Sequence, residues 1–195
     1  TATDITTING TNTGTITVTN TIDLNGSGSE VAAAIAAIDT NTGNVTANIT
    51  GGDYTAAQLK TINDATSGAI VLVDASVNLS GTAAVLDAAF AGTVTTHTGT
   101  VTISDAPSVA QLKAINGATT GAITLSTPTG AMSGSVADLL LAFAGTITTH
   151  TGTVTFSDGS ATDITATDIT TINDASTGTI TVSNAIDING SGKSE

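Results

Sequence analysis

Short runs in which polar and apolar residues alternate recur along the chain, and they predict strands with one buried face. In each run, mostly Thr or Ala alternates with Ile, Val, Leu or Phe, which matches the period of two of a β-strand. These runs lie at 15–18, 100–103, 122–125, 153–156 and 179–182. Further extended pieces follow some of them at 21–28, 76–81 and 185–192. The pattern therefore predicts many short strands.

Ala-rich segments between these runs carry apolar residues three or four positions apart, which predicts short helices with one narrow apolar stripe. The apolar pairs are Leu59 with Ile62, Leu112 with Ile115, Leu86 with Phe90, and Leu139 with Phe143. Ser29 with Glu30, and Ser135, stand before two such segments as helix-starting residues. Asn63 and Asn116, each followed by Gly or Asp, and the Ala-Gly steps elsewhere are predicted to end the helices.

The sequence repeats on two length scales. Residues 1–9 recur letter for letter at 165–173, and residues 55–72 match 108–125 at an offset of 53. A finer phrase, Thr or Ser followed by Gly, any residue and Ile or Val, returns about every 27 residues, with its glycines at Gly14, Gly43, Gly68, Gly99, Gly121, Gly152 and Gly178. Each 53-residue unit thus consists of two related half-units.

One helix and one or two strands per half-unit is the pattern of an α/β solenoid, in which each coil needs neighbours to cover its apolar side. We therefore predict an α/β fold: a repeat solenoid of about seven coils with a parallel β-sheet and short helices. The chain is predicted to be a single array with units at about 1–52, 53–105, 106–161 and, in part, 162–195. Neither end reads as a polar capping coil, so we expect a longer parent array or end-to-end self-association.

The charge composition argues against several classes of partner. Sixteen acidic residues oppose three Lys and no Arg, giving a net charge of −13. Nucleic acids and anionic membranes are bound chiefly through Lys and Arg, so neither is expected as a partner. No apolar run reaches the length that spans a bilayer, and no membrane insertion is expected. The chain lacks cysteine, so disulfides contribute nothing to its stability.

The phrases "DITTIN", "TGTITV", "IDLNGSG" and "THTGTVT" resemble those of giant repetitive surface and secreted proteins of bacteria, especially cyanobacteria. The resemblance covers the whole chain and concerns the style of the repeats. It implies an extracellular or cell-surface location and a role in adhesion, a surface coat or a filament.

Paired threonines on the outward side of the predicted strands are the candidate binding face. If the strands stack in register, these side chains form rows on a parallel sheet, an arrangement that resembles ice-binding solenoids. The residues are Thr15, Thr17, Thr100, Thr102, Thr153, Thr155, Thr179 and Thr181. Threonine is also simply a good strand residue, and the rows are interrupted elsewhere. Ice binding is therefore an alternative function, and the ligand, whether a surface or a glycan, is left open.

Two sets of residues are candidates for metal binding. His97 and His150 occupy equivalent places in two units, and the sequence favours polar corner residues over zinc ligands, because zinc needs three or four donors together. Acidic residues near strand ends could bind Ca²⁺, which would make the chain a calcium-dependent adhesin segment. These residues are Asp105, Asp158, Asp163 and Asp168. No other cofactor is predicted.

Catalysis has no support in the sequence, which carries no nucleophile elbow and no zinc-protease motif. We therefore predict a protein that is not an enzyme. The predicted function is that of a structural repeat protein of an extracellular surface layer, filament or adhesin, assembling by stacking of its coils.

Overall fold

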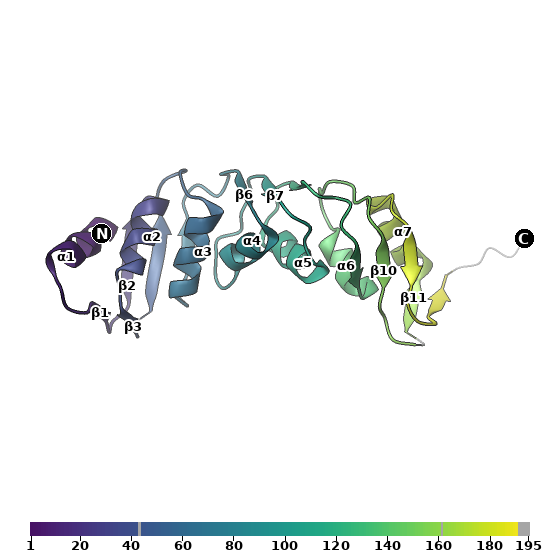
Figure 1. The fold of residues 1–195 in the computed structure, drawn as a ribbon, viewed down its shortest axis with the longest axis horizontal. Helices are drawn as coiled ribbons and strands as arrows, with labels where there is room; N and C mark the ends of the chain where they lie inside the picture. Colours follow the sequence, from purple (N-terminus) through teal and green to yellow (C-terminus); the bar gives the residue numbers. More distant parts are fainter. Residues whose placement is uncertain (43, 161, 191–195) are drawn as a thin grey trace, which may run out of the picture.

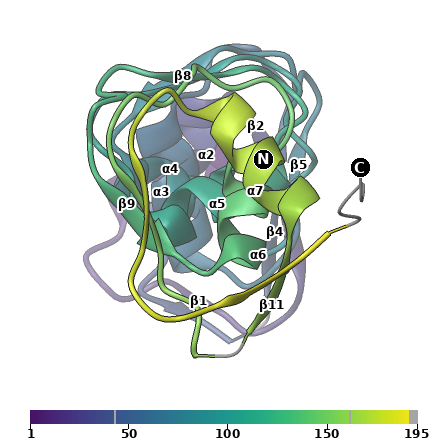
Figure 2. The same ribbon diagram turned by 90° about the vertical axis from the view of Figure 1, so that its right-hand side faces the viewer.

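The computed structural model of the chain describes residues 1–42, 44–160 and 162–190. It is elongated, and α1 and α7 lie toward opposite ends (Figure 1). The helices succeed one another in chain order along the long axis (Figure 1). In the described residues they are α1 (Ala2–Thr11), α2 (Gly28–Ala36), α3 (Ala56–Ala65), α4 (Ala83–Phe90), α5 (Val109–Ala118), α6 (Val136–Ala142) and α7 (Ala166–Ala175). Viewed along the axis, the helices overlap within an outline of strands and loops (Figure 2).

Short strands alternate with the helices, and each of the five alternating runs contains one of them. The strands are β1 (Thr17–Val18), β2 (Ile22–Gly26), β3 (Thr40–Asn41), β4 (Val45–Ile49), β5 (Ile70–Leu72), β6 (Leu79–Gly81), β7 (Val101–Ile103), β8 (Ile123–Leu125), β9 (Met132–Gly134), β10 (Val154–Phe156), β11 (Asp163–Thr165), β12 (Ile180–Val182) and β13 (Asp187–Asn189). The predicted mixed α/β class is therefore confirmed.

The strands pair in parallel but form several small sheets rather than the one parallel sheet predicted. Among the described residues the strand orders are β1-β3, β2-β4-β5, β6-β7-β8, β9-β10-β12 and β11-β13. Beyond β5 and β8 only single-residue bridges continue the pairing, from Ile70 to Val94 and from Ile123 to Ile147. Two further single-residue bridges join His97 to Thr119 and His150 to Ser176.

The core lies between the helices and the inward faces of the strands. Val101, Ile103, Val154 and Phe156, the apolar members of two alternating runs, have no exposed surface, whereas the intervening threonines are partly exposed. The apolar pairs predicted for the helices are buried as well. Burial of such a stripe contributes about 25 cal/mol for each Å² removed from water, so neighbouring half-units are held together mainly by these small apolar side chains.

The helix starts follow from side-chain capping. Ser135 begins α6 as predicted, its side chain accepting a hydrogen bond from the Asp138 N–H. The residue that begins α2 is Ser27 rather than Ser29: its hydroxyl accepts from the Glu30 N–H while the Glu30 carboxylate accepts from the Ser27 N–H. The bond from the Ser27 N–H holds the pKa of Glu30 below its ordinary value.

The predicted helix ends are correct at the Ala-Gly steps after α4 and α6 and wrong at the asparagines of α3 and α5. Gly92 and Gly145 of the Ala-Gly steps follow α4 and α6 with φ of 68° and 71°, the left-handed conformation that ends helices. Asn63 and Asn116, in contrast, lie inside α3 and α5, each of which continues for two further residues. The asparagines act on neighbouring helices instead, as described below.

Candidate functional site

The two histidines lie in the core, each in contact with the half-units before and after its own. His97 has no exposed surface, and its Nε2 lies 2.7 Å from the Val77 carbonyl oxygen on one side while Nδ1 lies 3.1 Å from Thr119 Oγ1 on the other. The backbone N–H of His97 also donates to the Ala118 carbonyl. One side chain thus joins three successive half-units.

His150 repeats this arrangement one unit later. Its Nε2 lies 2.7 Å from the Gly130 carbonyl oxygen and its Nδ1 3.3 Å from Ser176 Oγ, and it too is fully buried. The rings of Phe90 and Phe143 pack at centroid distances of 5.4 Å from His97 and 5.6 Å from His150. The sequence suggested polar corner residues; the structure gives both histidines the role of buried connectors.

The carbonyl partner fixes the protonation of His97. A carbonyl oxygen only accepts, so Nε2 of the neutral ring carries the proton. The Thr119 hydroxyl lies 3.1 Å from both Nδ1 and the His97 carbonyl oxygen, and its one proton is shared between these two acceptors. Burial disfavours the imidazolium form and lowers the pKa of His97 from its ordinary value of 6.5, against the raising effect of the Val77 carbonyl.

This depressed pKa predicts that the protein loses stability in mild acid. Below pH 6.5 the unfolded chain takes up a proton at His97 that the folded protein resists, so the free energy of unfolding falls as the pH decreases toward the folded pKa. Chemical denaturation of the wild-type protein and of His97→Leu between about pH 5 and pH 7 measures the free energy of unfolding of each at every pH. The stability difference between the two should shrink toward pH 5, and a pH-independent difference would contradict the assignment.

The glycine of the repeated phrase marks a close approach of two backbones. A Cβ on Gly121 would lie 1.7 Å from the Gly99 carbonyl oxygen, and one on Gly178 would lie 1.7 Å from that of Gly152. These distances are far inside van der Waals contact, so only glycine permits the approach. The phrase recognised in the sequence is therefore a contact between successive half-units.

Asparagines within α3 and α5 bind the C-terminal end of the following helix. Asn116 Nδ2 donates to the carbonyl oxygens of Leu141 at 2.9 Å and Ala144 at 2.8 Å, and Asn63 makes the equivalent bonds to Ala88 and Ala91. The last carbonyls of a helix lack partners within it, so these side chains satisfy groups that would otherwise need water.

Removing this cap gives a prediction with an internal control. Asn116→Ala should lower the free energy of unfolding by about 1–2 kcal/mol, because it leaves carbonyl groups of α6 without their donor. Asn173 occupies the same place in α7, the last helix of the described residues, and is exposed. Asn173→Ala should therefore change stability by less than about 0.5 kcal/mol. Equal losses for the two variants, measured by urea denaturation, would refute the capping role.

Three of the four candidate calcium ligands take part in helix capping. Asp105 accepts a hydrogen bond from the Ala83 N–H at 2.7 Å, and Asp158 accepts one from the Val136 N–H at 2.9 Å, so each carboxylate caps a helix of the preceding half-unit. Asp168 forms a capping box at the start of α7, and Asp163 is exposed on β11. Over 1–42, 44–160 and 162–190, no three His, Cys, Asp or Glu side chains are grouped so as to hold a metal ion.

The candidate threonine face is divided among the small sheets. Thr155 lies beside Thr181, with their hydroxyl oxygens 2.9 Å apart, and also pairs with Ser133; Thr102 pairs with Ser80 and Thr124 in a separate sheet. The remaining candidates are exposed, and they are Thr15, Thr17, Thr100, Thr153 and Thr179. Of these, Thr17 pairs with Thr40 in the two-stranded sheet, and the Thr100 hydroxyl donates a hydrogen bond to Asn78 Oδ1. Each hydroxyl row thus runs over three strands.

The equivalent row in the first three-stranded sheet has a different composition. It reads Asn25, Asn48 and Val71, with a 2.8 Å hydrogen bond from Asn48 Nδ2 to Asn25 Oδ1. Among the candidate threonines, Thr155 and Thr181 lie side by side in one sheet, whereas Thr102 belongs to a different sheet.

A hollow of about 510 Å³ lies at the C-terminal halves of α5 and α6. Gly117, which lines the hollow, stands at the position that Asp64 occupies in the equivalent helix α3. In α3 the Asp64 carboxylate pairs with Lys60. Its one charged residue, Lys113, is paired with Asp138 at 2.6 Å, and this hydrogen bond lowers the pKa of Asp138. The exposed Leu141 makes part of the wall. The rest of the lining consists of Asn116, Thr119, Thr120, Ala144 and Gly145.

Comparison with family models, with curated proteins and with solved structures finds no match for this chain. Within the described part of the chain, none of the helices has both the length and the apolar character needed to cross a bilayer.

Proposed function

We propose that this chain is a structural repeat protein, an α/β solenoid segment of an extracellular surface layer, filament or adhesin that assembles by stacking of its coils. The observation that supports this most directly is the use of the buried histidines. Both ring nitrogens of each histidine form hydrogen bonds to neighbouring half-units, as those of His97 do to Val77 and Thr119. Both ring nitrogens therefore help to hold neighbouring half-units together.

Other polar contacts of the repeat point the same way. The glycine corners, the asparagine caps and the caps made by Asp105 and Asp158 all join residues about one half-unit apart in the sequence. A protein whose repeated polar residues link neighbours is suited to carrying load along an axis. The acidic, Lys-poor composition suits a secreted protein, because a net charge of −13 resists nonspecific association.

Negative-stain electron microscopy and small-angle X-ray scattering of the purified chain test this function. We expect rod-shaped particles that lengthen by end-to-end association as the concentration rises. Thr96→Ala, at an exposed residue in the middle of the chain, serves as a control for the effect of substitution itself. Compact, monodisperse globules at every concentration would contradict the proposal.

A further inference from the structure

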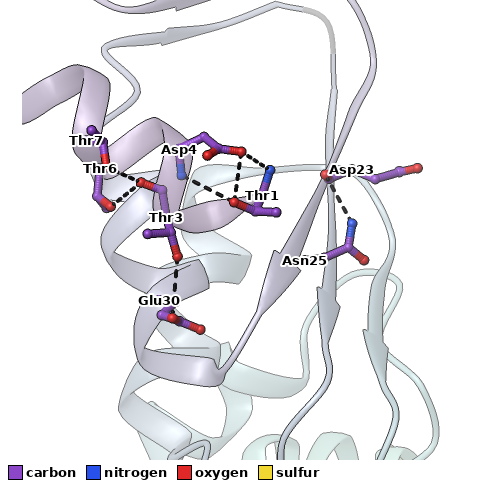
Figure 3. Close-up of polar contacts among 8 residues, drawn as sticks. All are labelled: Thr1, Thr3, Asp4, Thr6, Thr7, Asp23, Asn25 and Glu30. Atoms are coloured by element: carbon purple, nitrogen blue, oxygen red, sulfur yellow. Dashed lines mark hydrogen bonds and ion pairs between the residues drawn. The ribbon is translucent and has the colours of Figure 1, made fainter.

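Two near copies of one segment lie at opposite ends of the molecule (Figure 1). The first segment is residues 1–26 and the last segment is residues 165–190. They differ at six positions, which are Gly10, Thr11, Asn12, Thr19, Thr21 and Leu24 in the first segment. Both begin a helix in the same way, with a capping box of Thr1 and Asp4 in α1 (Figure 3) and of Thr165 and Asp168 in α7. The two segments therefore offer the same surfaces.

The two segments bury opposite faces. Ile8 of α1 is 50% exposed, whereas its equivalent in α7, Ile172, is fully buried, because α7 packs against α6 while α1, among the described residues, packs against α2 and β2. Leu24 of β2 is 2% exposed, whereas Ile188 of β13 is 59% exposed, because β2 pairs with the following β4. The face that the first segment exposes is thus the one that the last segment buries against α6 and β10.

The place that the last segment occupies suits the first segment in detail. Strand β12 pairs with β10 through Ile180 and Thr181, and the first segment has Ile16 and Thr17 at these positions. In the last segment, Ser176 Oγ accepts a hydrogen bond from the Gly178 N–H at 3.1 Å. At the equivalent position of the first segment, Asn12 Oδ1 accepts one from the Gly14 N–H at the same distance of 3.1 Å. Asn12 thus keeps the local turn that Ser176 makes in the last segment.

Simple stacking of two intact ends would make a different contact. Helices α1, α3, α5 and α7 carry Ile-Asn near their C-terminal ends, whereas α2, α4 and α6 do not, and the two types alternate along the chain. Packing α1 of one copy on α7 of another would place two helices of the same type together, whereas the extensive helix contacts within the described residues all join helices of different types.

We propose that copies of this chain join by exchange of the terminal segment: the first segment of a second copy takes the place of the last segment on α6 and β10. This inference rests on the proposed function, which needs stacking, and it names the partner and the surface. The second copy then continues the alternation of helix types, and its Ile8 becomes buried as Ile172 is now.

Disulfide trapping tests the exchange, since the chain contains no cysteine. Thr155 and Thr181 lie side by side, so a Thr155→Cys, Thr181→Cys chain should close an internal disulfide and shows that the pair can form. A ¹⁵N-labelled Thr17→Cys chain is then mixed with an unlabelled Thr155→Cys chain, warmed, cooled and oxidised. Exchange brings the two cysteines together, and mass spectrometry should find the mixed disulfide dimer well above the level from random collision.

Equivalent substitutions at the two ends separate exchange from chance contact. Ile172→Ala in the Thr155→Cys chain weakens the resident last segment and should raise the yield of mixed dimer several-fold. Ile8→Ala in the Thr17→Cys chain removes the side chain that exchange would bury and should reduce the yield to the random level. A yield that ignores both substitutions overturns the proposal.

A mixture of the Thr17→Cys and Thr181→Cys chains identifies direct stacking of intact ends. Efficient trapping of that pair, without trapping at Thr155, would overturn the exchange but leave the structural function standing. Rod-shaped assemblies with neither disulfide would do the same. Compact monomers in micrographs, with no trapping, would overturn both.

Discussion

Gly121→Ala is expected to lower the free energy of unfolding by more than about 3 kcal/mol, or to prevent folding. The added Cβ would lie 1.7 Å from the Gly99 carbonyl oxygen and 2.8 Å from that of Thr98, so the two half-units must separate. Backbone atoms cannot swing aside as a flexible side chain does. Denaturation followed by circular dichroism measures the loss, and Gly178→Ala, with a contact of 1.7 Å to Gly152, should behave alike.

Gly117→Ala is the matched control, four residues away in the same half-unit. A Cβ at Gly117 has no neighbour within 4 Å, and the residue lies near the end of α5. Alanine favours a helix over glycine by about 0.5–1 kcal/mol, so this variant should be slightly more stable than the wild type. If both variants lose similar stability, the close approach at the glycine corner is not what selects glycine.

His97→Ala is expected to cost about 3 kcal/mol or more. The substitution leaves a cavity beside Phe90 and removes hydrogen-bond partners from the Val77 carbonyl and the Thr119 hydroxyl. Urea denaturation monitored by circular dichroism gives the size of the loss. His150→Ala should show a loss of similar size, because its contacts are equivalent.

Two further substitutions separate the polar and the packing contributions of His97. His97→Leu keeps most of the volume but not the hydrogen bonds, and it should still cost about 1–3 kcal/mol. Thr96→Ala, at the exposed neighbouring residue, should change stability by less than about 0.5 kcal/mol. A leucine variant as stable as the wild type would show that the ring nitrogens contribute nothing to holding the half-units together.

Features that depend on local pattern could be predicted from the sequence. Alternation placed the strands around Val101 and Val154, and the three-to-four spacing placed the helices around Leu59 and Leu112. Both signals arise because each element must turn its apolar side to the core. The boundaries set by competing caps were less certain, as the shift from Ser29 to Ser27 shows.

The roles that depend on the neighbouring half-unit could not be predicted. Asn63 and Asn116 looked like helix ends because the residues that follow them favour turns, yet their partners are carbonyls 25 to 28 residues further along the chain. Asp105 looked like a calcium ligand, but its partner is an N–H 22 residues earlier. A one-dimensional pattern carries no information on which polar groups meet across such a distance.

By itself the sequence determined the mixed α/β class and the 53-residue repeat, because the first follows from local periodicity and the second from near copies of one segment. Only the tertiary structure decided that the sheet breaks into small parts and that His97 and His150 are buried connectors. It also decided which face each terminal segment buries. The physical reason is that burial and hydrogen bonding depend on which half-unit lies alongside, and identical segments acquire different surroundings at the two ends of the chain.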